Sequence, residues 1–189
     1  MSSDTLPSLS GQLLIAMPAI GDPHFERGVA LLCQHDDSGA AAVLINRRSE
    51  YGFRDVLRHL DLPADHAGLD RVPVLVGGPV QPERGFVLHS ADSQWESSYR
   101  INAQWAITTS RDILIAMAEG RGPQRALMTL GYAGWSPGQL EQELGDNAWL
   151  TVEAVDAILF DTALDERWQA ATRLVGIESF QLTPYAGHA

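Results

Sequence analysis

A glycine- and proline-rich stretch, residues 77–85, is the most unusual local sequence of this 189-residue chain. The adjacent Gly77 and Gly78 permit positive φ and a close approach of the backbone to another group. Arg84 adds a planar fork of hydrogen-bond donors. One interpretation is a rigid cradle for a small anion or polar ligand. The alternative is a tight connection between two core strands, in which Arg84 pairs with Glu83 or another acid.

A polar pair, Asn46-Arg47, directly follows an apolar run that is typical of a strand. Polar side chains at strand ends are found in binding sites and in structural ion pairs alike. We predict a polar recess at neighbouring strand ends, formed by Asn46, Arg47, Gly77, Gly78 and Arg84. Arginine forks suit a carboxylate or a phosphate. Asp22 and Glu83 are the rival partners, and either one paired with these arginines would make the recess a structural ion-pair cluster.

A third segment, residues 131–141, runs from a strand end into a helix start. Free N–H groups at such a start can bind an anion. The alternative is a packed strand–helix corner in which Trp135 is buried and Ser136 caps the helix. Glu141 brings negative charge to the same place, which favours the packed corner.

Other kinds of site lack their usual signals. The chain has one cysteine, Cys33, and its apolar neighbours predict a buried side chain on a strand. No two of the six histidines have a helical i, i+4 spacing, so we expect no metal site. There is no G-x-S-x-G motif, Walker loop or dinucleotide fingerprint. A Ser-His-Asp set could assemble only from distant positions, and no cofactor is implied.

The charge balance narrows the function classes further. The net charge is −11, and all thirteen basic residues are arginines. The absence of lysine excludes P-loop, Schiff-base and kinase-type lysines. It also argues against broad binding to a phosphate backbone, so we expect no direct nucleic-acid binding. With no apolar run long enough to span a bilayer and no secretory signal at the start, we expect a cytoplasmic protein without membrane contact.

The hydrophobic pattern predicts interspersed strands and helices rather than a regular βαβ repeat. Strands are expected at 11–17, 29–34, 40–45, 73–76, 85–88, 105–108, 127–132, 148–152 and 157–160. Helices are expected as a short turn after Asp22-Pro23, at 53–60, after Ser110, after Ser136 and after Thr162. We expect Leu57 and Trp168 to be buried on the apolar faces of their helices. A flexible segment, 1–10, would precede one α+β domain, 11–189.

Several of these segments carry a resemblance to a known family. They are Leu14-Ile-Ala-Met-Pro18, Val43-Leu-Ile-Asn-Arg47, Gly77-Gly-Pro-Val80, Arg84-Gly-Phe-Val-Leu-His89 and Gly131-Tyr-Ala-Gly-Trp135. Through them the chain resembles the AlgH-like (YqgE-like) family of bacterial proteins over nearly its whole length. The resemblance implies an α+β fold with a complex mixed or antiparallel sheet, a barrel-like β part and packed helices. It transfers no catalytic residues. Arg48 stands where the family usually has proline.

Three functions are consistent with these observations. The first is a non-enzymatic regulatory protein that binds a small anionic ligand or a protein partner. The second is a hydrolase or transferase acting on a small anionic metabolite. The third is a DNA-binding regulator, which follows only from the label of transcriptional regulator that family members often carry. The missing lysines and the negative charge favour the first.

Overall fold

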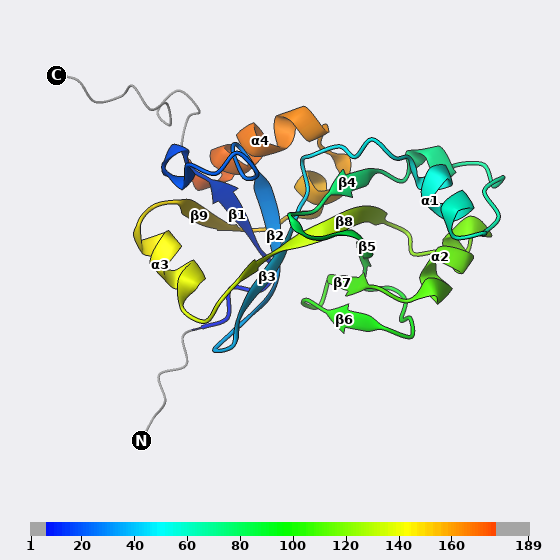
Figure 1. Ribbon diagram of the computed structural model, residues 1–189, viewed down its shortest axis with the longest axis horizontal. Helices are drawn as coiled ribbons and strands as arrows, with labels where there is room; N and C mark the ends of the chain where they lie inside the picture. The colour runs from blue at the N-terminus through cyan, green and yellow to red at the C-terminus, as the bar shows by residue number, and fades with distance from the viewer. Residues whose placement is uncertain (1–6, 177–189) are drawn as a thin grey trace.

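The computed structural model describes residues 7–176, which form one curled sheet with helices packed on its faces (Figure 1). The sheet has nine strands in the order β6-β7-β5-β8-β3-β2-β1-β9, and β4 pairs with β8 outside this path. All pairings are antiparallel except that of β4 with β8. The strands are β1 Gln12–Ala16, β2 Val29–Asp36, β3 Gly39–Leu44, β4 Val74–Val76, β5 Val80–Ser90, β6 Ser98–Arg100, β7 Trp105–Thr108, β8 Ala126–Trp135 and β9 Trp149–Glu153. This confirms the α+β class and the curled, barrel-like sheet.

Within residues 7–176, four α-helices and four shorter helical segments cover the sheet. The α-helices are α1 Phe53–His59, α2 Arg111–Ala118, α3 Gln139–Gly145 and α4 Arg167–Val175. The shorter segments are the 3-10 helices Pro18–Ile20, Leu69–Arg71 and Leu164–Glu166 and the π-helix Ala157–Asp161. In Figure 1, α4 lies at the top, α3 at the left, and α1 and α2 at the right.

Alternating side chains of the central strands supply two separate hydrophobic clusters. Leu13 and Ile15 of β1 point to one face, where they join Trp168 of α4. Leu14 and Ala16 point to the other face, which packs against α3. Period-two alternation in a strand produces this division when both faces of the sheet are covered. The sequence of β1 is therefore apolar throughout.

A third cluster lies beneath α1 and α2. Phe53 and Leu57 of α1 meet Ile113 and Met117 of α2 over the sheet. Leu57 is fully buried and Trp168 is nearly so, which confirms both predictions from the helical stripes. Apolar residues at i and i+4 bring both α1 side chains to the same face.

Three local predictions were wrong. Residues 23–27, after Asp22-Pro23, form turns rather than a helix, and the Asp22 side chain accepts the His24 N–H at 2.9 Å as in an Asx turn. The run 157–160, predicted as a strand, is the π-helix. A short apolar run has no periodicity that separates the two. Helix α3 begins at Gln139 with Gly138 as its N-cap, so Ser136 precedes the cap.

The chain ends are only partly described. Residues 1–6 and 177–189 lie outside the described part of the chain. Within the predicted N-terminal segment, the Ser8 hydroxyl donates to the His35 carbonyl at 3.1 Å and the Leu9 N–H donates to His35 Nδ1 at 3.1 Å.

Candidate functional site

Asn46 holds two parts of the backbone together at the end of β3. Its Oδ1 accepts the Val29 N–H at 2.9 Å, and its Nδ2 donates to the Arg27 carbonyl at 2.9 Å. Both ends of the amide are therefore used within the protein. Asn46 positions the 27–29 segment beside residues 45–47.

Arg47 continues from Asn46 and has spare hydrogen-bonding capacity. Its Nη2 donates to the Glu26 carbonyl at 2.5 Å. Its Nε is buried and has no hydrogen-bond partner among the described residues. A buried N–H without an acceptor costs free energy, so an acceptor that reached this atom through a local rearrangement of the side chain would be stabilising.

The glycine pair lies next to Arg47 but packs against β8. The Val76 N–H donates to the Arg47 carbonyl at 2.8 Å, and the Leu44 N–H donates to the Gly77 carbonyl at 2.8 Å. A Cβ at Gly77 would lie 2.3 Å from the Gly131 carbonyl oxygen, and one at Gly78 would lie 2.2 Å from the Tyr132 carbonyl carbon. The close backbone approach that these glycines permit is thus made by another strand.

Arg84 interacts with its own strand. It is exposed on β5, its Nη1 donates to Gln81 Oε1 at 3.2 Å, and its guanidinium lies 5.4 Å from the Phe86 ring centroid. None of its polar contacts in the described chain joins Arg84 to Asn46 or Arg47. The structure therefore brings together Asn46, Arg47 and the glycine pair, and gives Arg84 separate partners. The rival acids are not bound to either arginine: Asp22 contacts His24, and Glu83 forms none of the ion pairs found in residues 7–176.

Two further arginines surround the end of β3. Arg167 of α4 is 3% exposed, and it donates from Nη1 to the Ile45 carbonyl at 2.7 Å and from Nε to the Thr162 carbonyl at 2.9 Å. Burial lowers the pKa of its guanidinium to about 10, which still leaves it charged at neutral pH. The Arg27 guanidinium lies 4.5 Å from the centroid of the neighbouring Trp168 ring. We call Arg27, Arg47 and Arg167 the β3-end arginines.

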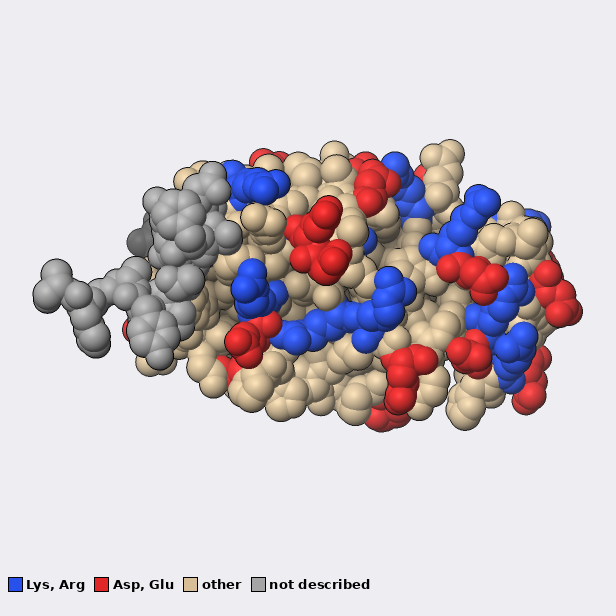
Figure 2. Space-filling model, turned by 90° about the horizontal axis from the view of Figure 1, so that it is seen from above, with Lys and Arg blue, Asp and Glu red and all other residues tan. Residues whose placement is uncertain are grey.

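The β3-end arginines have no carboxylate partner in residues 7–176. Arg54, Arg58, Arg121 and Arg125 do form ion pairs with acids there. Figure 2 looks onto the side of the molecule that carries α4, where basic side chains form a row along the middle with acidic side chains around them. Basic and acidic side chains therefore lie next to one another on this face.

Comparison with known proteins identifies the family. A family model described as AlgH-like matches residues 13–179. The chain belongs to the AlgH-like family. It is similar to a UPF0301 protein of Xanthomonas campestris pv. campestris, with 54% identity over 181 residues and 96% of each chain covered. It is also similar to a UPF0301 protein of Xylella fastidiosa, with 52% identity over 189 residues and all of each chain covered.

Two solved structures share the fold. The solution structure of the AlgH protein from Pseudomonas aeruginosa matches with a TM-score of 0.80 and 43% identity over the full length of both chains. A crystal structure of a Corynebacterium diphtheriae protein matches with a TM-score of 0.69 and 21% identity, covering 88% of this chain and 86% of that one. The second likeness shows the fold alone.

Arg48 stands where the family usually has proline. The backbone hydrogen bonds around Arg48 are compatible with either residue. Arg48 forms an isolated antiparallel bridge with Leu75. The hydrogen bonds that flank this bridge come from the Ser49 N–H to the Val74 carbonyl at 2.9 Å and from the Val76 N–H to the Arg47 carbonyl. The Arg48 N–H takes part in neither, so a proline would remove no bond from the bridge.

Arg167 was not among the predicted site residues, although the sequence around it indicates a buried arginine. Leu164, Arg167, Trp168 and Ala171 follow the spacing i, i+3, i+4, i+7 of a buried helical face. An arginine within such a stripe must either reach out to solvent or find buried acceptors. Arg167 finds two carbonyls, and its proximity to Arg47 depends on contacts between distant parts of the chain.

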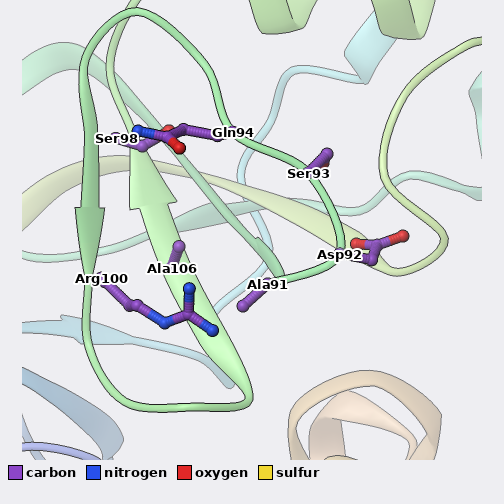
Figure 3. Close-up of a pocket in the computed structure, with 7 residues that line it drawn as sticks. All are labelled: Ala91, Asp92, Ser93, Gln94, Ser98, Arg100 and Ala106. Atoms are coloured by element: carbon purple, nitrogen blue, oxygen red, sulfur yellow. The ribbon is translucent and has the colours of Figure 1, made fainter.

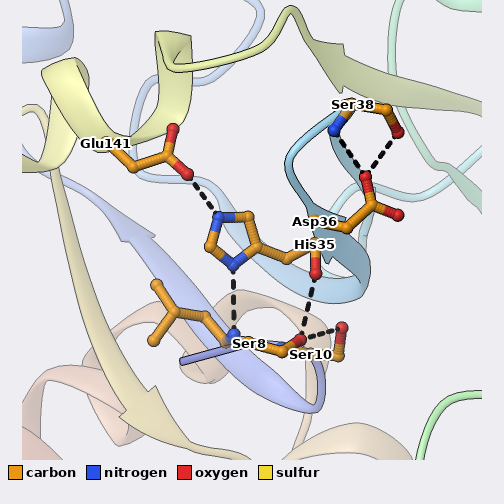
Figure 4. A network of polar contacts seen from close by, with 7 residues as sticks. Ser8, Ser10, His35, Asp36, Ser38 and Glu141 are labelled. Atoms are coloured by element: carbon orange, nitrogen blue, oxygen red, sulfur yellow. Dashed lines mark hydrogen bonds and ion pairs between the residues drawn. The ribbon is translucent and has the colours of Figure 1, made fainter. Parts of the chain in front are cut away.

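Other polar features of the AlgH-like fold have structural partners. His35 is buried, and its Nδ1 accepts the Leu9 N–H, so Nε2 carries the proton that is donated to Glu141 Oε1 at 2.5 Å (Figure 4). The hydrogen bond from His35 holds the pKa of Glu141 below its usual range. Burial raises the pKa of Cys33 to about 12, which leaves an unreactive thiol on β2 as the sequence predicted.

The segment 131–141 is the packed corner. Trp135 is buried, and its Nε1 donates to Glu143 Oε2 at 2.7 Å, the same oxygen that accepts Trp149 Nε1 at 2.9 Å. The carboxylate of α3 thereby satisfies two buried indole N–H groups.

Two hollows in the surface of residues 7–176 are lined by none of the predicted site residues. A recess of about 310 Å³ lies beside β6 (Figure 3), lined by Ala91, Asp92, Ser93, Gln94, Ser98, Arg100 and Ala106. A shallower groove of about 540 Å³ follows β3 and β8 over small side chains such as Ala41 and Gly134. Within residues 7–176 no three His, Cys, Asp or Glu side chains are grouped as metal ligands, and no helix could cross a membrane.

Proposed function

We propose that this protein is a regulatory binding protein that recognises a small anionic ligand at the β3-end arginines. The observation that carries the proposal is the Arg47 guanidinium, whose Nε is buried without a partner in the described chain. Arg167 and Arg27 lie around the same strand end through their contacts with Ile45 and Asn46. An anion bound at the end of β3 could accept a hydrogen bond from the Arg47 Nε–H, which has no acceptor within the described chain.

The lack of counter-charges supports the proposal. The chain has 24 acidic residues for 13 arginines, so carboxylates are abundant. The β3-end arginines nevertheless form none of the ion pairs found in the described residues. Arg167 is buried without an ion pair, and the Asp161 carboxylate only partly offsets the cost of burying its charge, so a bound carboxylate or phosphate would offset more of it.

Binding at this place would couple α4 to the sheet. Arg167 is the first residue of α4, and its Nη1 contacts the carbonyl of Ile45, which directly follows β3. An anion held by Arg47 and Arg167 together would strengthen this connection. Ligand binding would then change the affinity of a protein partner that binds the face carrying α4. This change in affinity is the regulatory part of the proposal.

A thermal unfolding series tests the binding. The melting temperature is measured in phosphate, citrate and chloride at matched ionic strength for the wild type, Arg47→Gln and Arg84→Gln. Phosphate or citrate should raise the melting temperature of the wild type and of Arg84→Gln, because a ligand that binds only the folded state stabilises it. Arg47→Gln should lose the increase. Equal increases in all three proteins would show a general salt effect and contradict the proposal.

A further inference from the structure

A chain of hydrogen bonds links a buried histidine to the recess beside β6. His89 of β5 is fully buried, and its Nε2 lies 2.8 Å from Thr108 Oγ1. The Thr108 oxygen, also fully buried, lies 2.7 Å from Ser98 Oγ. Ser98 is half-buried and lines the recess. Three side chains from three strands thus form one continuous path.

The direction of the protons along this path is fixed by a carbonyl. His89 Nδ1 lies 2.8 Å from the Ser90 carbonyl oxygen, which can only accept. Nδ1 therefore carries the proton of the neutral ring and Nε2 is an acceptor. Thr108 must donate its single proton to Nε2, and so Ser98 donates to Thr108. Burial lowers the pKa of the His89 imidazole, which keeps the ring neutral.

The recess also holds a guanidinium with a free donor. Ser98 and Arg100 stand two residues apart on β6 and so project from the same face, and Figure 3 shows both at the recess. Arg100 Nε donates to the Asn102 carbonyl at 3.1 Å and Nη2 to the Ala103 carbonyl at 3.2 Å, which leaves Nη1 without a partner in residues 7–176. Asp92 is occupied by the Ser90 hydroxyl at 2.6 Å and the Gln124 N–H at 3.2 Å.

We propose that Ser98 is the nucleophile of a hydrolytic site for small esters that carry an anionic group, which Arg100 binds. The Ser98 oxygen attacks the ester carbonyl carbon while its proton passes to Thr108 and the Thr108 proton passes to His89 Nε2. The Thr108 hydroxyl, 2.7 Å from the Ser98 oxygen, then gives a proton to the alcohol oxygen while His89 returns its proton to Thr108, so that the bond to the alcohol oxygen breaks and the neutral alcohol leaves. In the second half, water gives a proton to Thr108, whose own proton passes to His89, and the water oxygen bonds to the acyl carbon. The bond to the Ser98 oxygen then breaks, Ser98 takes the proton back from Thr108 and His89, and the acid is released.

This activity goes beyond the proposed function and does not depend on it. The β3-end arginines and the recess beside β6 share no residue. A Ser-His arrangement joined through a threonine matches no local sequence motif, because Ser98, Thr108 and His89 come from separate strands. The general requirement for an activated nucleophile is a base that can take its proton, and the hydrogen-bond path provides one.

Labelling with a fluorophosphonate tests the nucleophile. The wild type should gain the phosphonyl mass with loss of fluoride, and peptide mapping should place it on Ser98. Ser98→Ala should not be labelled. Thr108→Val, which keeps the side-chain shape but cuts the path, should react at least about tenfold more slowly, whereas Thr108→Ser should react nearly as fast as the wild type. Ser97→Ala, a change of the exposed neighbouring serine that does not line the recess, is the control and should react normally.

Several results would overturn the proposal. They are an unlabelled wild type, a label that stays in Ser98→Ala, or equal rates in Thr108→Val and the wild type. If Thr108→Val does not fold, His89→Gln carries the same expectation of slower labelling. For the substrate class, the wild type should prefer 4-nitrophenyl hemisuccinate over 4-nitrophenyl butyrate in kcat/KM, and Arg100→Gln should lose this preference. A wild type that does not prefer the charged ester would exclude Arg100 from substrate binding.

Discussion

Arg167 donates a hydrogen bond of 2.7 Å from Nη1 to the carbonyl of Ile45, across 122 positions of the sequence. This contact joins the start of α4 to the end of β3 and buries a cation without a carboxylate partner in the described chain. A protein that only needed this packing could use an apolar side chain here at similar or lower cost. The buried charge therefore supports a binding role for the strand end.

The core beneath α1 predicts a large effect of a single truncation. Leu57 is fully buried between α1 and the sheet, so Leu57→Ala should lower the free energy of unfolding by about 2–5 kcal/mol. Ile115→Ala on the exposed side of α2 is the control and should cost less than about 1 kcal/mol, since Ile115 is 36% exposed. Urea unfolding measures both. A loss below about 0.5 kcal/mol for Leu57→Ala would contradict the packing of α1.

The bond between His35 and Glu141 predicts a dependence of stability on pH. The pKa of Glu141 is lowered in the folded protein from its ordinary value of 4.5, so the folded state favours the carboxylate. Its contribution to stability is fully present above pH 4.5 and is lost as the pH falls through the lower, folded pKa. Wild type should therefore be more stable than Glu141→Gln at neutral pH, and the difference should shrink in acid. Urea midpoints measured across this range check the sign, and a difference that grows in acid would contradict it.

The bridge between Arg48 and Leu75 predicts how proline is tolerated in this loop. Arg48→Pro should change the free energy of unfolding by less than about 1 kcal/mol, because the bridge does not use the Arg48 N–H. Ser49→Pro removes the N–H that donates to the Val74 carbonyl at 2.9 Å and should cost about 3 kcal/mol. Thermal or urea unfolding distinguishes the two positions. Equal losses would show that the loop shape, not the hydrogen bond, sets the tolerance.

The charge distribution predicts weak interaction with nucleic acid. With a net charge of −11 and three arginines at the β3 end, the protein should show no nanomolar binding to a defined DNA duplex. Fluorescence anisotropy with a labelled duplex at several salt concentrations measures this. Tight, sequence-specific binding with a steep salt dependence would favour the DNA-binding regulator instead.

Sequence reasoning predicted those features that depend on nearby residues. The continuous apolar runs of β2 and β3 predicted two strands, and the apolar stripe of α1 predicted a helix and its buried face, because both patterns are local. The three-residue strand β6 was missed, since Ser98–Arg100 carries no apolar pattern. The π-helix at Ala157–Asp161 follows Asp156, whose carboxylate accepts the Trp105 indole N–H at 2.6 Å, a contact between distant positions that the local sequence does not show.

The candidate site was predictable only in part, for the same reason. Asn46 and Arg47 were found because they follow a strand in the sequence. Arg27 lies near Asn46 because β2 pairs with β3, and Arg167 lies near Ile45 because α4 packs on the sheet. No short sequence motif predicts either contact. Gly77 and Gly78 were expected to let the backbone approach a ligand, and in the structure the backbone that they approach closely is that of β8.

The Arg47 Nε–H is the group that tests the anion site most directly. Its ¹H–¹⁵N resonance can be followed by NMR while inorganic phosphate is added to the wild type, with Arg84→Gln as the control. We predict a saturable shift of the Arg47 Nε–H signal at submillimolar to millimolar phosphate in both proteins, because this buried N–H lacks an acceptor in the described chain. An Arg47 signal that stays unchanged into the millimolar range, or that moves only linearly with salt, would contradict an anion-binding role for the end of β3.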